Sequence, residues 1–200
     1  KVGGEAIGRF QKAEHAIPML SLEKAYEEQD LRDWLARMER DFGAPIEGGF
    51  TVEPKLDGDS LELLYEKGVF IRASTRGDGR VGEDVTHTVR TIRSVPLRLQ
   101  GSPPDLLEVR GEAFIRIDDF RELNRRLMEA EEVPFANPRN FTSGSIKQLD
   151  PKVTERRPLR FSAYALGRSE GKAFRTHSES VAYLGELGLP IVENLARATS

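Results

Sequence analysis

The spacing of apolar residues changes at Phe50, and this change limits the possible folds more than any other feature of the sequence. Between residues 21 and 43 apolar side chains recur at helical spacing, which predicts an amphipathic helix with Ser21 as its N-cap. From residue 50 to residue 57 apolar and polar residues alternate, which predicts a strand with one apolar face. Pro54 cannot donate a ladder hydrogen bond, so this strand is predicted at a sheet edge or at a bulge.

The rest of the chain mixes predicted strands with predicted helices. Residues 60–66 and 69–75 are predicted to form a hairpin, because Glu66-Lys67-Gly68 is a turn signal. Hairpins and helices in mixed order predict the α+β class. The further elements predicted are strands over 106–115 and 159–166, helices over 83–92, 117–130 and 178–187, and a loop leading into a helix over 137–149.

The composition excludes several classes of protein. None of the 200 residues is a cysteine, which excludes a disulfide scaffold, a thiolate zinc site and a cysteine nucleophile. No apolar run approaches the roughly 20 residues that a membrane-spanning helix needs. The net charge of −3 argues weakly against a nucleic-acid partner.

Two stretches are nevertheless basic. Residues 72–98 carry six basic and three acidic side chains, and residues 139–160 carry six basic and two acidic ones. Clustered cations can neutralise phosphates, but surface charges are also scattered in this way by chance. Because clustering along the sequence does not establish a patch in space, both interpretations stay open.

The most informative segment is Glu53-Pro54-Lys55-Leu56-Asp57-Gly58. On a strand, Glu53, Lys55 and Asp57 would project from the same face. They are either a row of surface ion pairs, which contributes little to stability, or a nucleophilic lysine with its neighbours. A lysine attacks phosphorus only as the neutral amine, so a catalytic Lys55 would need burial, nearby arginines or a divalent cation to lose its proton.

Residues 77–82 fit the glycine pattern of dinucleotide-binding loops, G-x-G-x-x-G. No acidic residue follows at 97–102, where that fold places one, and the preceding strand belongs to a hairpin. A tight turn that aims Arg76 is therefore favoured.

Two further groups of polar residues stand out. One consists of charges that share one face of a strand (Glu108, Arg110 and Glu112). The other consists of isolated histidines, which lack metal-ligand spacing (His15, His87 and His177).

Six ordered segments resemble the adenylation domain of bacterial NAD-dependent DNA ligases. Together they cover nearly the whole chain, and their order and spacing carry the resemblance, because K-x-D-G alone is a weak motif. The segments are His15–Leu22, Glu53–Gly58, Ala73–Thr86, Glu108–Glu112, Phe135–Asn140 and Arg160–Tyr164.

The resemblance implies a nucleotidyltransferase fold, with two antiparallel sheets, flanking helices and the nucleotide between the sheets. It implies that Lys55 attacks the α-phosphate of NAD, expels nicotinamide mononucleotide and becomes a lysyl-AMP. Asp57 would orient this nucleophile or support a magnesium ion, and no residue is assigned as a dedicated metal ligand. The other implied contacts are with adenine (Glu53 and Tyr164), with the ribose (Arg76 and Glu112), with the nucleotide site in general (Ser21 and Leu22) and with phosphate or DNA (Arg139 and Lys147).

The resemblance also implies boundaries and partners. Residues 1–18 are predicted to be a linker from an N-terminal nicotinamide-binding domain, and residues 19–200 a partial adenylation domain. The parent protein would seal nicks in duplex DNA as a cytoplasmic monomer, independent of membranes, with zinc only in a downstream module. The segment alone is expected to be weakly active or inactive, since other nucleotide-binding parts would lie outside it.

The sequence departs from the family pattern at several positions. Asp59-Ser60 replaces small or apolar residues, Phe141-Thr142-Ser143 replaces a run of alanines, and Lys147 replaces an arginine. Lysine is a point charge rather than a bidentate fork, so phosphate geometry at Lys147 differs from the family pattern. Two alternatives remain: an ATP-dependent RNA ligase or capping-type nucleotidyltransferase, and a non-catalytic nucleotide-binding remnant. The presence of both Lys55 and Glu112 argues against the remnant.

Overall fold

The computed structural model describes residues 10–198, which fold as two compact units. The larger unit contains the described residues up to Met19 together with residues 55–192. The smaller unit contains residues 20–54 and the described residues from Glu193 onward. None of the helices described between residues 10 and 198 is long and apolar enough to cross a membrane.

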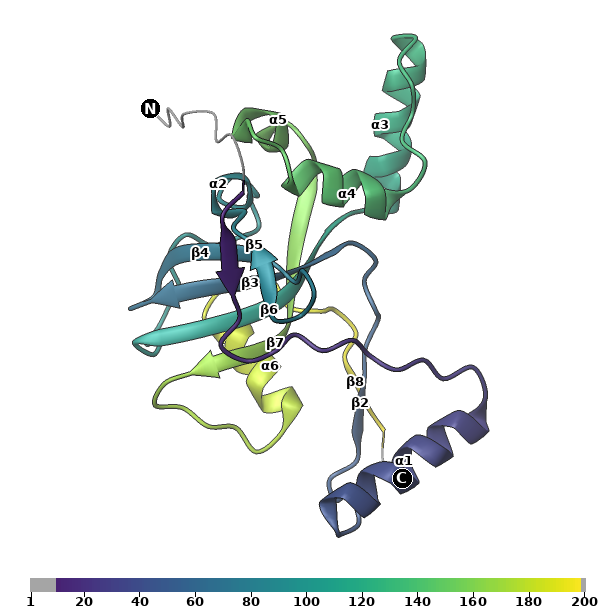
Figure 1. Cartoon of the computed structure of the whole chain (residues 1–200), viewed down its shortest axis with the longest axis vertical. Helices are drawn as coiled ribbons and strands as arrows, with labels where there is room; N and C mark the ends of the chain where they lie inside the picture. The colour runs from purple at the N-terminus through teal and green to yellow at the C-terminus, as the bar shows by residue number, and fades with distance from the viewer. Residues whose placement is uncertain (1–9, 199–200) are drawn as a thin grey trace. The chain divides into compact units, whose positions relative to one another are not determined.

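A four-stranded antiparallel sheet forms the centre of the larger unit (Figure 1). The predicted hairpin is confirmed, and its turn residues Lys67 and Gly68 have φ angles of 48° and 74°, the left-handed geometry that tight hairpin turns need. In spatial order the strands are β4 (Val69–Thr75), β3 (Asp59–Glu66), β6 (Leu106–Ile115) and β7 (Leu159–Ser169).

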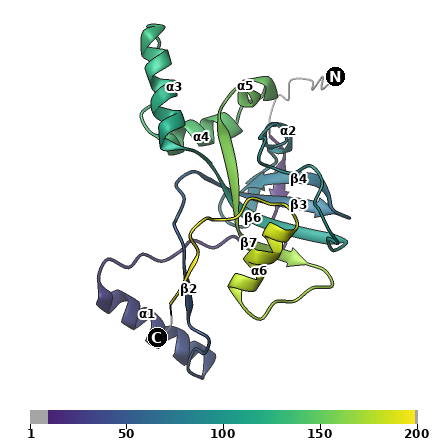
Figure 2. The same cartoon turned by 180° about the vertical axis from the view of Figure 1, so that it is seen from behind.

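The two faces of this sheet differ in polarity because side chains alternate along its strands. Leu61 and Leu63 of β3 and Leu107 and Val109 of β6 are fully buried on the apolar face. Helix α6 (His177–Glu186) joins this core through the buried Leu184. The opposite face carries polar residues of β3 and β6, and it is on this side that β1 lies, as the front and back views show (Figures 1 and 2).

Strand β1 (Lys12–Glu14) pairs antiparallel with β5 (Val81–Glu83). The described part of the predicted linker 1–18 therefore contributes a strand, which is a correction; residues 1–9 lie outside the described residues. The weak period of residues 1–18 did not reveal this strand, whose partner is about 70 positions further along the chain.

The glycine pattern at residues 77–82 forms a turn between β4 and β5, not a phosphate-binding loop before a helix. Gly77 and Gly79 have φ angles of 57° and 94°. A Cβ atom at Gly77 would lie 1.9 Å from the carbonyl oxygen of Val81, so this turn admits no side chain there. The prediction of a tight turn is confirmed.

The helices of the larger unit broadly follow the predicted ranges. Asn137 caps the helix that follows it, its side chain accepting a hydrogen bond from the Asn140 N–H at 2.7 Å. The helix predicted over 83–92 is shorter than expected, and the helix after Asp150 was not predicted. The elements are α2 (Thr86–Val89), α3 (Ile117–Glu129), α4 (Pro138–Ile146), α5 (Pro151–Glu155) and α6.

The smaller unit consists of helix α1 (Glu28–Phe42) and the two-stranded sheet of β2 (Phe50–Val52) and β8 (Ala196–Ala198). The prediction that a helix starts at Ser21 is wrong. The helix begins at Glu28 because the Asp30 carboxylate accepts the Glu27 N–H at 3.1 Å, completing a capping box.

The predicted strand over residues 50–57 is also too long. Strand β2 ends at Val52, because β8 offers partners only to residues 50–52. Pro54, two residues later, has no N–H to extend the ladder. Glu53, Lys55 and Asp57 therefore do not share one face of a strand, and any grouping of their side chains has another cause.

Candidate active site

The polar face of the central sheet places three residues in one row across its strands. Ser60 of β3 lies directly opposite Glu112 of β6, and Ser162 of β7 lies opposite Glu112 on the other side. The sheet register therefore brings a carboxylate between two hydroxyl-bearing residues. The period-two charges of β6 had marked Glu112, but nothing in the sequence gave its partners.

Glu112 is buried, with 6% of its surface exposed, and both of its carboxylate oxygens accept hydrogen bonds. Oε1 accepts the Gly58 backbone N–H at 3.0 Å, and Oε2 accepts the Ser60 hydroxyl at 2.7 Å. Burial raises the pKa of Glu112, and the nearby Asp59 charge raises it further, whereas the two hydrogen bonds and the Lys55 cation lower it. Glu112 thus ties the end of the K-x-D-G segment to the sheet.

Gly58 can be nothing other than glycine at this position. A Cβ atom there would lie 1.8 Å from the carbonyl oxygen of Ala113, so the backbone would have to move. The backbone at Gly58 therefore lies close to the backbone at Ala113, and this close approach allows the Gly58 N–H to reach Glu112.

Lys55 and Asp57 stand at the exposed end of the segment that Glu112 holds. Asp57 Oδ1 lies 3.4 Å from Arg139 Nη1, an exposed ion pair that joins the segment to α4. Lys55 is exposed, so burial does not supply the neutral amine that nucleophilic attack requires.

Asp59 gathers the cations of the site. Burial raises the pKa of Asp59, while a hydrogen bond with Ser143 and the charges of Lys147, Arg139 and Arg76 lower it. These residues come from three places in the sequence: the end of β4, both ends of α4 and the start of β3. Lys147 also forms an ion pair with Glu83 of β5, Nζ to Oε2 at 2.5 Å.

Tyr164 of β7 adjoins the same group. Burial raises the pKa of this phenol, and the nearby Ser60 hydroxyl lowers it. The Glu112 carboxylate raises the pKa further, and the Arg110 and Arg76 guanidiniums lower it.

The larger unit therefore brings together a set of the predicted site residues that are far apart in sequence. Ser21, Leu22 and Glu53 belong instead to the smaller unit, where Ser21 and Leu22 are exposed and Glu53 is half-buried. Asp59 and Ser60 had been noted only as departures, and Gly58 only as part of the motif. The residues brought together are Lys55, Asp57, Arg76, Glu112, Arg139, Lys147 and Tyr164.

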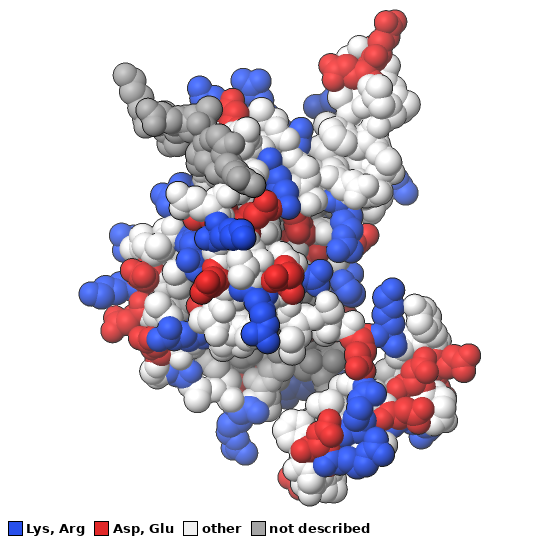
Figure 3. All heavy atoms as spheres, in the orientation of Figure 1, with Lys and Arg blue, Asp and Glu red and all other residues white. Residues whose placement is uncertain are grey.

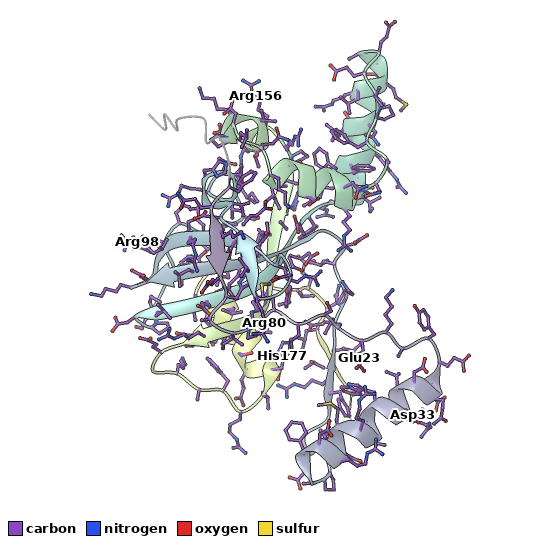
Figure 4. The ribbon with its side chains drawn as sticks, in the orientation of Figure 1. Glu23, Asp33, Arg80, Arg98, Arg156 and His177 are labelled. Carbon is purple, nitrogen blue, oxygen red and sulfur yellow. The ribbon has the colours of Figure 1, made fainter. Side chains whose placement is uncertain are left out.

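The labelled residues of the two basic stretches lie apart from one another in Figure 4: Arg98 is at one edge of the larger unit, Arg156 is at another, and Arg80 is near the middle of the view. On the face shown in Figure 3, Lys and Arg are interspersed with Asp and Glu. The cations that converge are the ones around Asp59, which is the local arrangement that phosphate binding needs.

Comparison with known sequences identifies the family. The model of the NAD-dependent DNA ligase adenylation domain matches residues 7–200. The chain belongs to this family. Its α+β architecture of antiparallel sheets and helices agrees with that assignment, and the resemblance carried by the six segments is confirmed.

Curated DNA ligases from bacteria match this adenylation domain over almost all of its length. The chain is 49% identical over 193 residues to the DNA ligase of Rubrobacter xylanophilus, covering 96% of the chain and 28% of the relative. It is 46% identical to the ligase of Roseiflexus castenholzii (98% and 29%) and 46% identical to that of Geobacter sulfurreducens (96% and 29%). The chain thus spans less than a third of the length of these relatives.

Proposed function

We propose that this chain is the adenylation part of a longer NAD-dependent DNA ligase and that Lys55 accepts AMP from NAD. The observation that supports this most directly is the hydrogen bond from Gly58 to Glu112, which fixes the K-x-D-G segment beside Arg76, Tyr164 and the α4 cations. Residues 19–200 would form this adenylation part, with further modules of the ligase outside it.

The reaction follows from the chemistry of the groups present. The neutral Nζ of Lys55 attacks the α-phosphorus of NAD, and a nitrogen–phosphorus bond forms. The bond from that phosphorus to the bridging oxygen breaks, and nicotinamide mononucleotide leaves with the electron pair. The lysine nitrogen loses its proton, so the product is a lysyl-AMP phosphoramidate.

The cations around Asp59 have a defined part in this step. Negative charge shifts onto the phosphoryl oxygens and the leaving group during transfer, and preorganised cations stabilise it. Arg76, Arg139 and Lys147 would supply these cations, and Arg139 and Lys147 would also contact phosphates of nicked DNA. A cation bound with the substrate would in addition favour the neutral form of Lys55.

The remaining roles follow the family pattern. Glu53 and Tyr164 would contact adenine, Ser21 and Leu22 would line the nucleotide site, and Asp57 would orient the nucleophile. The parent ligase would act as a monomer on chromosomal DNA in the cytoplasm.

Magnesium has no ready-made site among residues 10–198, where no group of three or more His, Asp or Glu side chains is placed to hold an ion. Magnesium is usually held by one or two carboxylates together with substrate phosphates. We therefore assign no step to it, and its binding would depend on the nucleotide.

The test uses the full-length protein with NAD labelled in its adenine half. Mass spectrometry of the intact protein should show the addition of one AMP, which Lys55→Ala and Lys55→Arg should abolish, because arginine cannot supply a neutral nucleophile. Lys152→Ala, an exposed lysine on α5, is the matched control and should label normally. An adduct on the Lys55→Ala protein would contradict the assignment, and labelling by ATP rather than NAD would identify an ATP-dependent relative instead.

A second experiment addresses the part played by the rest of the ligase. The isolated 200-residue chain is expected to react with NAD at most weakly, because it spans less than a third of the relatives' length. Rapid addition of AMP to the isolated chain would show that it contains a complete adenylation site.

A further inference from the structure

Ser60 lies at the junction between two residues of the proposed nucleotide site. Its hydroxyl donates to Glu112 Oε2 at 2.7 Å, and Tyr164 of β7 lies near enough for the Ser60 hydroxyl to lower the pKa of its phenol. A serine hydroxyl has one proton to donate, and here that proton goes to Glu112. Ser60 of β3 is therefore joined by a hydrogen bond to Glu112 of the adjacent strand β6.

The Glu112 carboxylate depends on this donor. Its Oε1 is occupied by the Gly58 N–H, and the residue is buried. Without Ser60, Oε2 would be a buried carboxylate oxygen with one donor fewer, which is costly for a charged group. Glu112 would then turn toward water or take up a proton, and either change would weaken its hold on Gly58 and on the segment that begins at Lys55.

The opposite neighbour of Glu112 does not replace Ser60. Ser162 occupies the matching position on β7, but its hydroxyl is buried and makes no hydrogen bond among the residues that the structure describes. Two serines thus flank the same carboxylate in register, and only Ser60 donates to it. This asymmetry provides an internal control for the role of the hydroxyl.

We propose that Ser60 is a positioning residue for adenylation: its hydroxyl fixes the Glu112 carboxylate, and through Glu112 it sets the position of the segment that carries Lys55. This inference rests on the proposed function, since it assigns Ser60 a part in the AMP transfer to Lys55. It also gives a role to a residue by which this chain departs from the family pattern.

The position of Ser60 predicts a specific dependence on pH. The ionisable groups that face Glu112 are Lys55 before β3, Asp59 on β3 and Tyr164 on β7. The Ser60 hydrogen bond lowers the pKa of Glu112, so its loss lets that pKa rise. Because the Gly58 N–H bonds an ionised carboxylate more strongly than a neutral carboxyl, the acid-side fall in adenylation rate should then move to higher pH.

The experiment measures single-turnover AMP transfer from NAD to the full-length protein between pH 5.5 and 8.5. Ser60→Ala should slow transfer by about 10-fold at neutral pH, the effect of losing one hydrogen bond to a charged group, and should move the acid limb upward. Ser60→Thr, which keeps the hydroxyl, should show the normal rate and the normal pH for the acid-side fall in rate. Ser162→Ala should match the unchanged protein in both.

The Ser60→Cys variant tests whether the changes in Ser60→Ala come from the lost hydrogen-bond donor or from a folding defect. It keeps nearly the volume of serine but donates weakly, so it should show the same slower rate and shifted limb as Ser60→Ala. If both variants retain the normal rate and pH profile, or if Ser162→Ala causes the same changes, the inference is overturned. If the unchanged protein forms no adduct on Lys55, the proposed function itself has failed, which is a separate result.

Discussion

Glu62 and Glu112 are both buried carboxylates on the polar face of the central sheet, yet their partners are of different kinds. Glu62, 2% exposed, has Oε1 at 2.9 Å from His15 Nδ1 and Oε2 at 3.5 Å from Arg110 Nε. Glu112, 6% exposed, takes its two hydrogen bonds from a backbone amide and a serine hydroxyl, which are neutral donors. One carboxylate faces a guanidinium and an imidazole, and the other accepts hydrogen bonds from a backbone amide and a hydroxyl.

The surroundings of Glu62 indicate a structural role. His15 Nε2 lies 3.1 Å from the Thr75 carbonyl oxygen and 3.2 Å from that of Arg76, so both ring nitrogens face acceptors. His15, which looked isolated in the sequence, therefore connects the end of β1 to β3 and to the end of β4 through these contacts.

Arg110 makes a second connection to the segment that follows β1. Its guanidinium donates to the carbonyl oxygens of Ile17 and, at 3.2 Å, of Pro18. The segment after β1 is thus fastened to β6, which supplies Glu112 two residues further along the same strand face. Matched charges hold the segment in place, whereas Glu112, held by neutral donors, stays next to the exposed Lys55.

The largest expected effect is on AMP transfer in Glu112→Gln. An amide keeps the size of the side chain but loses the charge that the Gly58 N–H and Lys55 face, so single-turnover transfer in the full-length protein should fall on the order of 100-fold or more. The stability of the chain to urea should be nearly unchanged. A large loss of stability together with normal activity per folded molecule would move Glu112 into the same class as Glu62.

Glu62→Gln should have the opposite outcome. Removing the charge of the buried Glu62 leaves the Arg110 guanidinium without its carboxylate partner, and the free energy of unfolding should fall by about 3 kcal/mol. Transfer by the molecules that remain folded should change little, because Glu62 makes no contact with Lys55 or Gly58 among the described residues. Urea unfolding gives the stability, and normalising activity to the folded fraction separates the two effects.

These two carboxylates also show what the sequence could predict. The turn signal at residues 66–68 predicted the strand over 60–66, and the residues of 106–115 predicted the other strand, because both signals are local in the sequence. The partners were not predictable in the same way: His15 and Glu62 are 47 positions apart, and Ser60 and Glu112 are 52 apart. Which polar residues meet depends on strand register, and alternation along a single strand does not fix register between strands.

The errors at the element ends have a similar physical origin. Spacing predicted a helix from Ser21, but the capping box at Glu27 and Asp30 decides where it begins. Alternation predicted a strand to Asp57, but strand length is set by the partner, and β8 pairs only with residues 50–52. The K-x-D-G segment was therefore identified by its residues, while its actual support, the Gly58–Glu112 bond, was visible only in the fold.

A smaller effect concerns stability as a function of pH. Burial raises the pKa of Glu112 in the folded chain, so the folded state binds more protons than the unfolded state in the range between the two pKa values. The stability associated with this group is therefore fully present at low pH and is lost as pH rises through the folded pKa. Glu112→Gln removes that loss, so its stability relative to the unchanged chain should improve between pH 5 and pH 7.5.

Asp59→Asn gives a matched comparison, because burial raises the pKa of Asp59 as well. Urea unfolding at the two pH values should show the same direction of change for both variants. A relative stability of Glu112→Gln that declines with rising pH would mean that the folded state favours the ionised carboxylate, as a charge-matched pair would.

The smallest expected effect separates Arg139 from the charges around Glu62. Arg139 and Asp57 form an ion pair at 3.4 Å, but their side chains are 58% and 73% exposed, and exposed pairs of this kind contribute less than about 1 kcal/mol. A double-mutant cycle of Arg139→Ala and Asp57→Ala should therefore give a small coupling in unfolding free energy. AMP transfer should nevertheless slow in Arg139→Ala, and Arg139→Lys should restore it only in part, because lysine lacks the bidentate fork.

A strong coupling in stability with unchanged AMP transfer would show that Arg139 has a structural role like that of Arg110. Slower transfer without coupling would instead place Arg139 with Glu112, as a residue whose charge serves the site.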